Sequence, residues 1–271
     1  MALPELLDET VRAVQSSPRY ACIDAGLVRR IAAQELAKGR SLKDAIKAVR
    51  SKLHQVGGAY QETAIPYAHW RAELAAMDPG LSSDSPALQA FCKRALAQHA
   101  STRERLPVLE RFFHETLASL GPIHSVLDLA CGLNPLALPW MPLAQGAQYY
   151  ACDIYTDMVE FINDFLRCAG QAGLAETCDL VAGCPQRPAQ LALLLKTIPC
   201  LEQIDKEIGA RLLESIPAEA VLVSFPARSL GGRSKGMLQN YEARFRQIVD
   251  GKDWEIERFE FSGELAYLIK K

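Results

Sequence analysis

The hydrophobic pattern of the first 120 residues has a helical period. Apolar residues recur every three or four positions, with few β-branched runs between Pro4 and Leu120. This pattern predicts helices at residues 4–16, 24–38, 41–54, 62–77, 84–98 and 102–120. We therefore expect an all-helical N-terminal domain, which we place at residues 1–100.

After Gly121-Pro122 the period changes to strands alternating with helices. Strands are predicted at residues 123–130, 147–152, 178–182, 190–196, 219–225, 254–261 and 264–270. Helices are predicted at residues 135–143, 155–169, 201–214 and 236–249. The alternation predicts an α/β domain over residues 101–271, with a mostly parallel sheet whose last two strands form a hairpin at Ser262-Gly263.

The first predicted strand leads into a glycine turn. The stretch Ser125-Val-Leu-Asp-Leu-Ala-Cys-Gly-Leu-Asn-Pro-Leu-Ala-Leu138 predicts a strand, a tight turn at Gly132 and a helix start, where backbone can approach a ligand closely. Further glycines of the dinucleotide fingerprint are missing, which disfavours a nicotinamide or flavin site. Asp153 ends the second predicted strand, where an acid can accept hydrogen bonds from ribose hydroxyls. The structural alternatives are a buried strand with a tight turn, and an acid at a helix N-terminus.

Composition excludes several classes of protein. Hydrophobic residues make up 49% and charged residues 23% of the 271 residues, as in ordinary globular proteins. No apolar run approaches the roughly 18–20 residues of a membrane span, and the acidic start Met-Ala-Leu-Pro-Glu is unlike a signal peptide, so we expect a cytoplasmic protein. The eight cysteines form no Cys-x-x-Cys pair, which predicts reduced, buried thiols and no metal site.

The net charge of −2 hides a basic region in the N-terminal half. One stripe of the third predicted helix carries Lys43, Lys47, Arg50 and His54. Further cations lie nearby in the sequence: Arg29, Arg30, Lys38, Arg40 and Lys52. Two interpretations are open, a solvated helix face or a face that binds nucleic-acid phosphates.

Four segments resemble one family. They are His99-Ala-Ser-Thr-Arg-Glu-Arg105, Leu127-Asp-Leu-Ala-Cys-Gly-Leu-Asn-Pro-Leu-Ala-Leu138, Ser224-Phe-Pro-Ala-Arg-Ser-Leu-Gly-Gly-Arg-Ser-Lys-Gly-Met237 and Glu264-Leu-Ala-Tyr-Leu-Ile-Lys-Lys271. Together they resemble the bacterial 16S rRNA guanine-N7 methyltransferases that confer aminoglycoside resistance. The resemblance implies a class I S-adenosylmethionine-dependent methyltransferase: a Rossmann-like, seven-stranded α/β sheet with an N-terminal helical domain that docks on the 30S subunit. It also implies a monomer.

The resemblance implies a set of residues that bind S-adenosylmethionine and its product S-adenosyl-L-homocysteine. Those at the methionine end would be Tyr60, His99, Ala100, Ser101 and Arg105, with Arg105 paired to the cofactor carboxylate. Along the rest of the cofactor would lie Ala130, Gly132, Asp153 at the ribose, and Leu195 near the adenosine and the incoming base. The family places an acid after the third strand, near the adenine amino group. The aligned residue is Val181, so either Asp179 takes that role or backbone alone reads the adenine.

Target RNA would be held by two regions. The basic helical stripe would dock on 16S rRNA within the assembled 30S subunit. The glycine-rich segment after the fifth strand would contact the extruded nucleotide through Arg228, Arg233, Lys235 and Met237.

Two other functions compete with guanine-N7 methylation. Guanine N7 carries a lone pair and no proton, so its methylation requires no general base, and we predict no catalytic acid–base residue. Pro199-Cys200 instead fits a cytosine-C5 methyltransferase, whose thiolate attacks C6 of the ring. A non-catalytic ribosome-binding protein is the other alternative, and the joint presence of Arg105, Gly132 and Asp153 argues against it.

Overall fold

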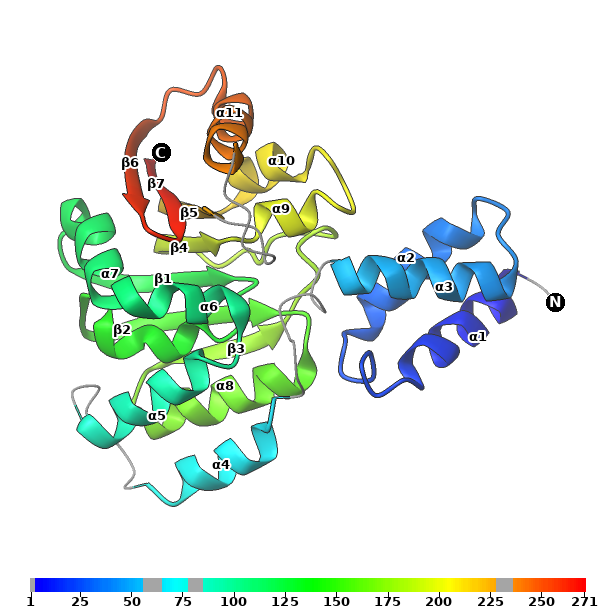
Figure 1. The fold of residues 1–271 in the computed structure, drawn as a ribbon, viewed down its shortest axis with the longest axis horizontal. Coiled ribbons are helices and arrows are strands. Elements are labelled where there is room, and N and C mark those ends of the chain that lie inside the picture. The colour runs from blue at the N-terminus through cyan, green and yellow to red at the C-terminus, as the bar shows by residue number, and fades with distance from the viewer. Residues whose placement is uncertain (1–2, 56–64, 78–84, 228–235) are drawn as a thin grey trace.

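The computed structural model describes residues 3–55, 65–77, 85–227 and 236–271, and its centre is a seven-stranded sheet (Figure 1). The strands are β1 (Ile123–Leu129), β2 (Leu143–Asp153), β3 (Gly173–Thr177), β4 (Ala189–Leu195), β5 (Ala218–Pro226), β6 (Glu255–Phe261) and β7 (Glu264–Lys270). Their order is β3-β2-β1-β4-β5-β7-β6. The first five pair in parallel, and β7 is antiparallel to both neighbours, as the sequence predicted.

Both faces of the central strands are buried. Along β4, Leu191 and Leu193 belong to one apolar cluster, whereas Ala192 and Leu194 belong to the other. Continuous apolar strands of this kind are typical of parallel sheets covered by helices on both sides. The second cluster contains residues of α9 (Ile198–Leu201), α10 (Ile208–Ser215) and α11 (Met237–Val249).

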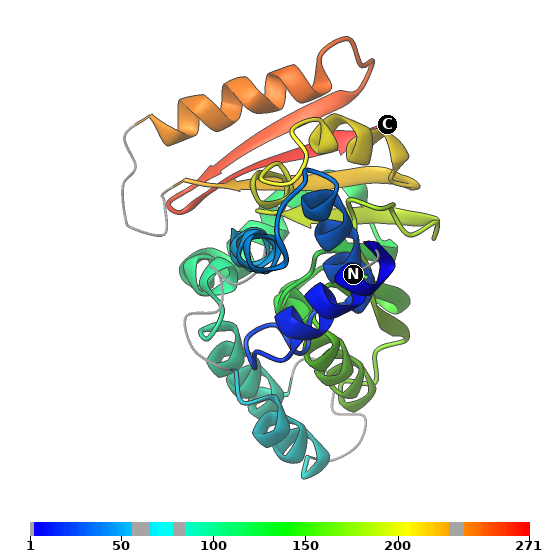
Figure 2. The same ribbon diagram turned by 90° about the vertical axis from the view of Figure 1, so that its right-hand side faces the viewer.

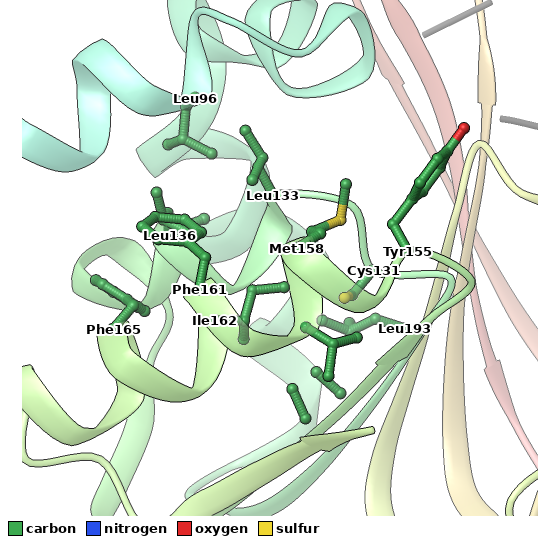
Figure 3. Packing of buried hydrophobic residues seen from close by; sticks show 14 of the residues in the cluster. Leu96, Cys131, Leu133, Leu136, Tyr155, Met158, Phe161, Ile162, Phe165 and Leu193 are labelled. Atoms are coloured by element: carbon green, nitrogen blue, oxygen red, sulfur yellow. The ribbon is translucent and has the colours of Figure 1, made fainter. Parts of the chain in front are cut away.

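The first cluster is centred on α8 (Thr156–Cys168). Figure 3 shows Phe161 and Phe165 of this helix beside Leu133 and Leu136, which belong to the segment after β1. The elements that complete this layer are α4 (Tyr67–Ala75), α5 (Pro86–Leu96), α6 (Ala100–Arg105), α7 (Leu109–Leu117) and the 3₁₀ helix Asn134–Trp140.

The first three helices pack on one another as a bundle: α1 (Leu3–Gln15), α2 (Ala25–Leu36) and α3 (Leu42–Leu53). Asp24 and Ser41 cap α2 and α3, each accepting a backbone N–H bond with its side chain. Figures 1 and 2 place the bundle beyond the arrowheads of β1, β2 and β3. Backbone pairing of Ile23 with Tyr155 joins it to the loop after β2.

Helices α4 and α5 precede residue 100 but pack on the α/β domain. The ring centroids of Tyr67 and Trp70 in α4 each lie 5.4 Å from that of Phe161 in α8, and Phe91 of α5 lies 6.4 Å from it. The functional division at residues 100 and 101 stays a prediction. None of the helices in the described part of the chain is long and apolar enough to span a bilayer.

Several predicted elements were wrong in detail. The third strand is residues 173–177, not 178–182, because it lies at the sheet edge and buries only Ala175, which leaves little apolar signal. The helix predicted at 102–120 is interrupted at the 3₁₀ turn Leu106–Val108, which contains Pro107. The one at 135–143 is 3₁₀ and contains Pro139, and the one at 201–214 divides into α9 and α10.

Candidate cofactor site

A cleft opens at the carboxyl ends of β1, β2 and β4, with about 860 Å³ of empty space counted to its open mouth. This is the edge where ligands bind in open α/β sheets. Most of the predicted cofactor residues line the cleft: His99, Ser101, Arg105, Ala130, Gly132, Asp153, Val181 and Leu195. Ala100 is buried beside it without lining it, and Tyr60 lies outside the described residues.

The loop after β1 is held by a buried carboxylate. Asp128 accepts hydrogen bonds from the Tyr149 hydroxyl (2.6 Å) and the Asn134 amide (2.8 Å). Burial raises the pKa of Asp128 to about 7, although these two bonds and nearby Arg105 oppose the shift. Asn134 lines the cleft and accepts from Arg105 Nη1 (2.9 Å) through its own oxygen. Asn134 was not among the predicted site residues, although its position just after the glycine turn could have indicated it.

Gly132 and Asp153 are bonded to each other at the edge of the cleft. The Gly132 N–H donates to Asp153 Oδ2 (2.8 Å), and the Ile154 N–H donates to Oδ1 (2.7 Å). Burial raises the pKa of Asp153, against the effect of these backbone donors. The carboxylate thus fixes the glycine loop while it lines the cleft, which places it where the sequence predicted a ribose contact.

His99 covers Gly132 on the other side. Its Nδ1 is 2.9 Å from Ser101 Oγ, and burial and the cations Lys196 and Arg103 lower the pKa of His99 to about 4. The ring is therefore neutral at physiological pH. A Cβ at Gly132 would lie 3.2 Å from His99 Cε1, and φ is +52°, so an alanine here would strain its own backbone and press on the His99 ring.

A buried ion-pair cluster adjoins the cleft through Arg105 and Lys196, which line it. Arg105 donates to Glu264 from Nε (3.0 Å) and Nη2 (2.6 Å), so three of its five N–H donors are used on Glu264 and Asn134. Lys196 Nζ donates to Glu104 (2.7 Å) and lies 3.5 Å from Glu264. Burial would raise the pKa of Glu264, but the two cations hold it below its usual value. Lys196 and Glu264 were not predicted as site residues.

The loops at the cleft carry backbone strain. Ala130 after β1 (φ 50°) and Lys196 after β4 (φ 57°) are the two non-glycine residues with positive φ in the described part of the chain. Such conformations cost about 1–2 kcal/mol per residue and concentrate at functional sites. Both residues line the cleft.

The corrected position of β3 changes which acidic residue follows the strand. Because the strand ends at Thr177, the acid that follows it is Asp179. Asp179 and Val181 both line the cleft, and the Val181 N–H donates to Asp179 Oδ1 (3.0 Å). Asp179 is therefore the first acid after β3, and its role at the adenine stays a prediction.

Cys200 also lines the cleft. It is buried, and its thiol donates to the carbonyl oxygen of Lys196 (3.4 Å). No group of three or more histidine, cysteine or acidic side chains within the described ranges is placed to hold a metal ion.

The predicted RNA-binding residues differ in their surroundings. Lys43 and Lys47 are exposed on α3. His54 pairs with Arg19 (2.9 Å), and Arg50 donates to the Ala13 carbonyl (2.6 Å), so both also hold the bundle together. The neighbouring cations form ion pairs: Arg29 with Asp8, Arg30 with Asp179, and Lys38, Arg40 and Lys52 with the buried Glu35.

Of the predicted nucleotide contacts, Met237 is half-buried at the first turn of α11. Arg228, Arg233 and Lys235 lie outside the described residues. RNA contacts at all of these positions stay predictions.

We expect Gly132→Ala to destabilise the protein by about 2 kcal/mol. The substitution adds the cost of a left-handed alanine, about 1–2 kcal/mol, to the contact with His99. The matched control is Gly146→Ala, where φ is +74° but no atom lies within 4 Å of the new Cβ. Chemical denaturation should show a larger loss of unfolding free energy in Gly132→Ala than in Gly146→Ala. Equal losses would mean that the His99 ring moves aside at no cost in free energy.

The chain is similar to known proteins over nearly its whole length. A family model described as ribosomal RNA methyltransferase (FmrO) matches residues 16–268. The 16S rRNA (guanine(1405)-N(7))-methyltransferase of Micromonospora rosea is 36% identical over 267 residues, covering 98% of this chain and 97% of that protein. The protein of the same name from Serratia marcescens is 34% identical, covering 98% of each.

Solved structures agree with this assignment. The 16S rRNA methyltransferase RmtF, crystallised with S-adenosyl-L-homocysteine, has a TM-score of 0.85 and 36% identity over the whole of both chains. The 16S rRNA methylase RmtB has a TM-score of 0.81 and 30% identity over 98% of each chain. The chain belongs to the FmrO family of ribosomal RNA methyltransferases.

Proposed function

We propose that this protein transfers the methyl group of S-adenosylmethionine to N7 of a guanine in the decoding site of 16S rRNA, within the assembled 30S subunit. The modification would confer aminoglycoside resistance, and the enzyme would act as a cytoplasmic monomer. The observation that carries the proposal is the cleft itself. It combines the Gly132 turn, Asp153 and Arg105 at the edge of the sheet in a chain with full-length guanine-N7 methyltransferase relatives.

The residues of the cleft fit the cofactor. Two N–H donors of Arg105 are not used by Glu264 or Asn134, and a guanidinium suits a carboxylate such as that of the methionine end. Gly132 permits close backbone approach, and Asp153 lies beside it as the ribose acceptor. Asp179, at the far end of the cleft, would accept from the adenine amino group.

The proposed chemistry places modest demands on the protein. S-adenosylmethionine supplies a methyl group activated by its sulfonium. The guanine N7 lone pair forms the new bond without losing a proton, so the site needs no general base. Leu195, Cys200 and Thr197 at the mouth of the cleft would orient the base and exclude water.

The same chemistry explains resistance. N7 methylation leaves a positive charge on the guanine, and the added methyl occupies its major-groove edge. Aminoglycosides carry protonated amines, so the modified base would repel them. Resistance then requires no change in the rRNA sequence.

The bundle α1–α3 would dock on rRNA, so the double variant Lys43→Gln/Lys47→Gln should weaken 30S binding. Each lost phosphate contact lowers the slope of log affinity against log salt by about 1. The control Lys252→Gln/Lys270→Gln changes the net charge equally, at ion-paired residues of the β6–β7 end of the molecule (Figure 1). Filter binding measures this slope. If Lys43→Gln/Lys47→Gln leaves the slope of log affinity against log salt unchanged, α3 does not contact the rRNA.

The experiment that tests the function is methyl transfer from labelled S-adenosylmethionine to 30S subunits, free 16S rRNA and 50S subunits. We expect label on a decoding-site guanine in 30S only, at a site cleaved by aniline after borohydride reduction. Cys200→Ser should retain transfer. Label on a cytosine that is lost in Cys200→Ser would instead establish the C5 mechanism, and cofactor binding without any transfer would favour a binding protein.

A further inference from the structure

The N-terminal bundle forms part of the wall of the cofactor cleft. Leu27 of α2 lines the cleft. The segment before α2 is bonded to the loop after β2: the Asp24 N–H donates to the Ile154 carbonyl, and the Thr156 N–H to the Cys22 carbonyl, both at 2.8 Å. Because Ile154 also lines the cleft, these bonds fix one of its rims to the bundle.

Arg30 of α2 holds the neighbouring loop after β3, which also lines the cleft. Its Nε donates to Asp179 Oδ2 (2.6 Å) and its Nη2 to Oδ1 (3.0 Å), a two-bond pair between residues 149 apart in the chain. The Arg30 side chain is 23% exposed and that of Asp179 10%, so water screens the pair only in part. A two-bond guanidinium–carboxylate pair fixes the orientation of the carboxylate as well as its charge.

The hydrogen bonds of Asp179 leave room for one more donor. A carboxylate has about four acceptor positions. Arg30 takes two of these and the Val181 N–H takes a third, on Oδ1. The remaining position belongs to Oδ2, on a residue that lines the cleft.

We propose that Arg30 is a positioning residue of the cofactor site, which holds Asp179 so that its remaining acceptor receives the adenine amino group. This rests on the cofactor placement proposed above. It makes the bundle part of the cofactor site as well as a docking element. The alternative is that the pair only clamps the bundle to the α/β domain, in which case its loss would weaken every ligand of the cleft equally.

The test compares two ligands by titration calorimetry on the full chain. One is S-adenosyl-L-homocysteine, and the other is its inosine counterpart, in which oxygen replaces the adenine amino group. We expect Arg30→Met to weaken S-adenosyl-L-homocysteine about tenfold and the inosine ligand much less, so the preference for adenine shrinks. The control is Arg29→Met, which removes an ion pair with Asp8. The Arg29 side chain is 53% exposed and that of Asp8 52%, so this variant should bind both ligands as the unchanged chain does.

Two results would overturn the proposal. Equal loss of affinity for both ligands would mean that Arg30 only joins the bundle to the α/β domain. Unchanged affinities would mean that Arg30 has no role in the cofactor site. Should Arg30→Met fail to fold by circular dichroism, Arg30→Lys makes the same comparison with a point charge in place of the two-bond pair. The assay contains no RNA, so a wrong rRNA target does not affect it. Failure of the unchanged chain to bind either ligand would overturn the proposed function and this inference together.

Discussion

Glu264→Gln should lower the free energy of unfolding by about 3–5 kcal/mol, the cost of removing one partner from a buried ion pair. The carboxylate is 1% exposed and lies against Arg105 and Lys196, whose side chains are each 2% exposed. Glutamine keeps the shape but removes the charge, so both cations stay buried with less compensation. Ser224, which donates to Oε1 at 2.5 Å, would compete for the single remaining oxygen.

Thermal and urea denaturation would measure this loss, which corresponds to roughly 10 °C in Tm for a protein of this size. The control is Glu255→Gln on β6, whose partner Lys270 is 28% exposed, and it should cost less than about 1 kcal/mol. Lowering the pH should reduce the difference in the free energy of unfolding between Glu264→Gln and the unchanged protein. The pKa of Glu264 is lowered on folding, so its contribution is present above the unfolded pKa of about 4.5 and is lost as pH falls through the folded value. Equal losses in the two variants would show that the buried cations find other partners.

The proximity of two predicted site residues could be predicted from the sequence, because the end of a strand has a defined place in the sheet. Gly132 and Asp153 follow β1 and β2, and parallel neighbours end at the same edge of a sheet, so their proximity follows from the pattern alone. The predicted fold class and family were confirmed. The end of β3 was misplaced because this strand is short and mostly exposed, so the sequence left the role of Asp179 open.

The ion pairs could not be predicted in this way. Arg105 and Glu264 are 159 residues apart, and the spacing of charges along a chain does not reveal which of them pair when buried. Arg30 shows the same limit: its neighbour Arg29 has the same residue type and pairs within the bundle, whereas Arg30 reaches the cofactor cleft. Helix periodicity assigns such residues to a face but not to a partner.

Asp153→Asn should weaken the binding of S-adenosyl-L-homocysteine about thirtyfold. The two carboxylate oxygens accept separate backbone bonds, from Gly132 N–H and Ile154 N–H. An asparagine offers one oxygen and one NH₂ group, so in either orientation one backbone donor faces another donor. An unsatisfied buried group costs about 1–3 kcal/mol, and about 2 kcal/mol corresponds to this loss in affinity. The displaced Gly132 loop would disturb the cleft even before any ribose contact is counted.

Calorimetry on the purified chain would measure the change, with Asp164→Asn as the matched control. Asp164 lies on α8 and pairs with Arg71 and Arg167 away from the cleft, so its variant should bind the ligand within about twofold of the unchanged protein. If the Asp153 variant also binds within twofold, neither the loop bonds of Asp153 nor a ribose contact of its carboxylate contributes to ligand binding. A loss confined to Asp153→Asn, with far-ultraviolet circular dichroism unchanged, would instead establish that the carboxylate supports ligand binding through the glycine turn that it orders.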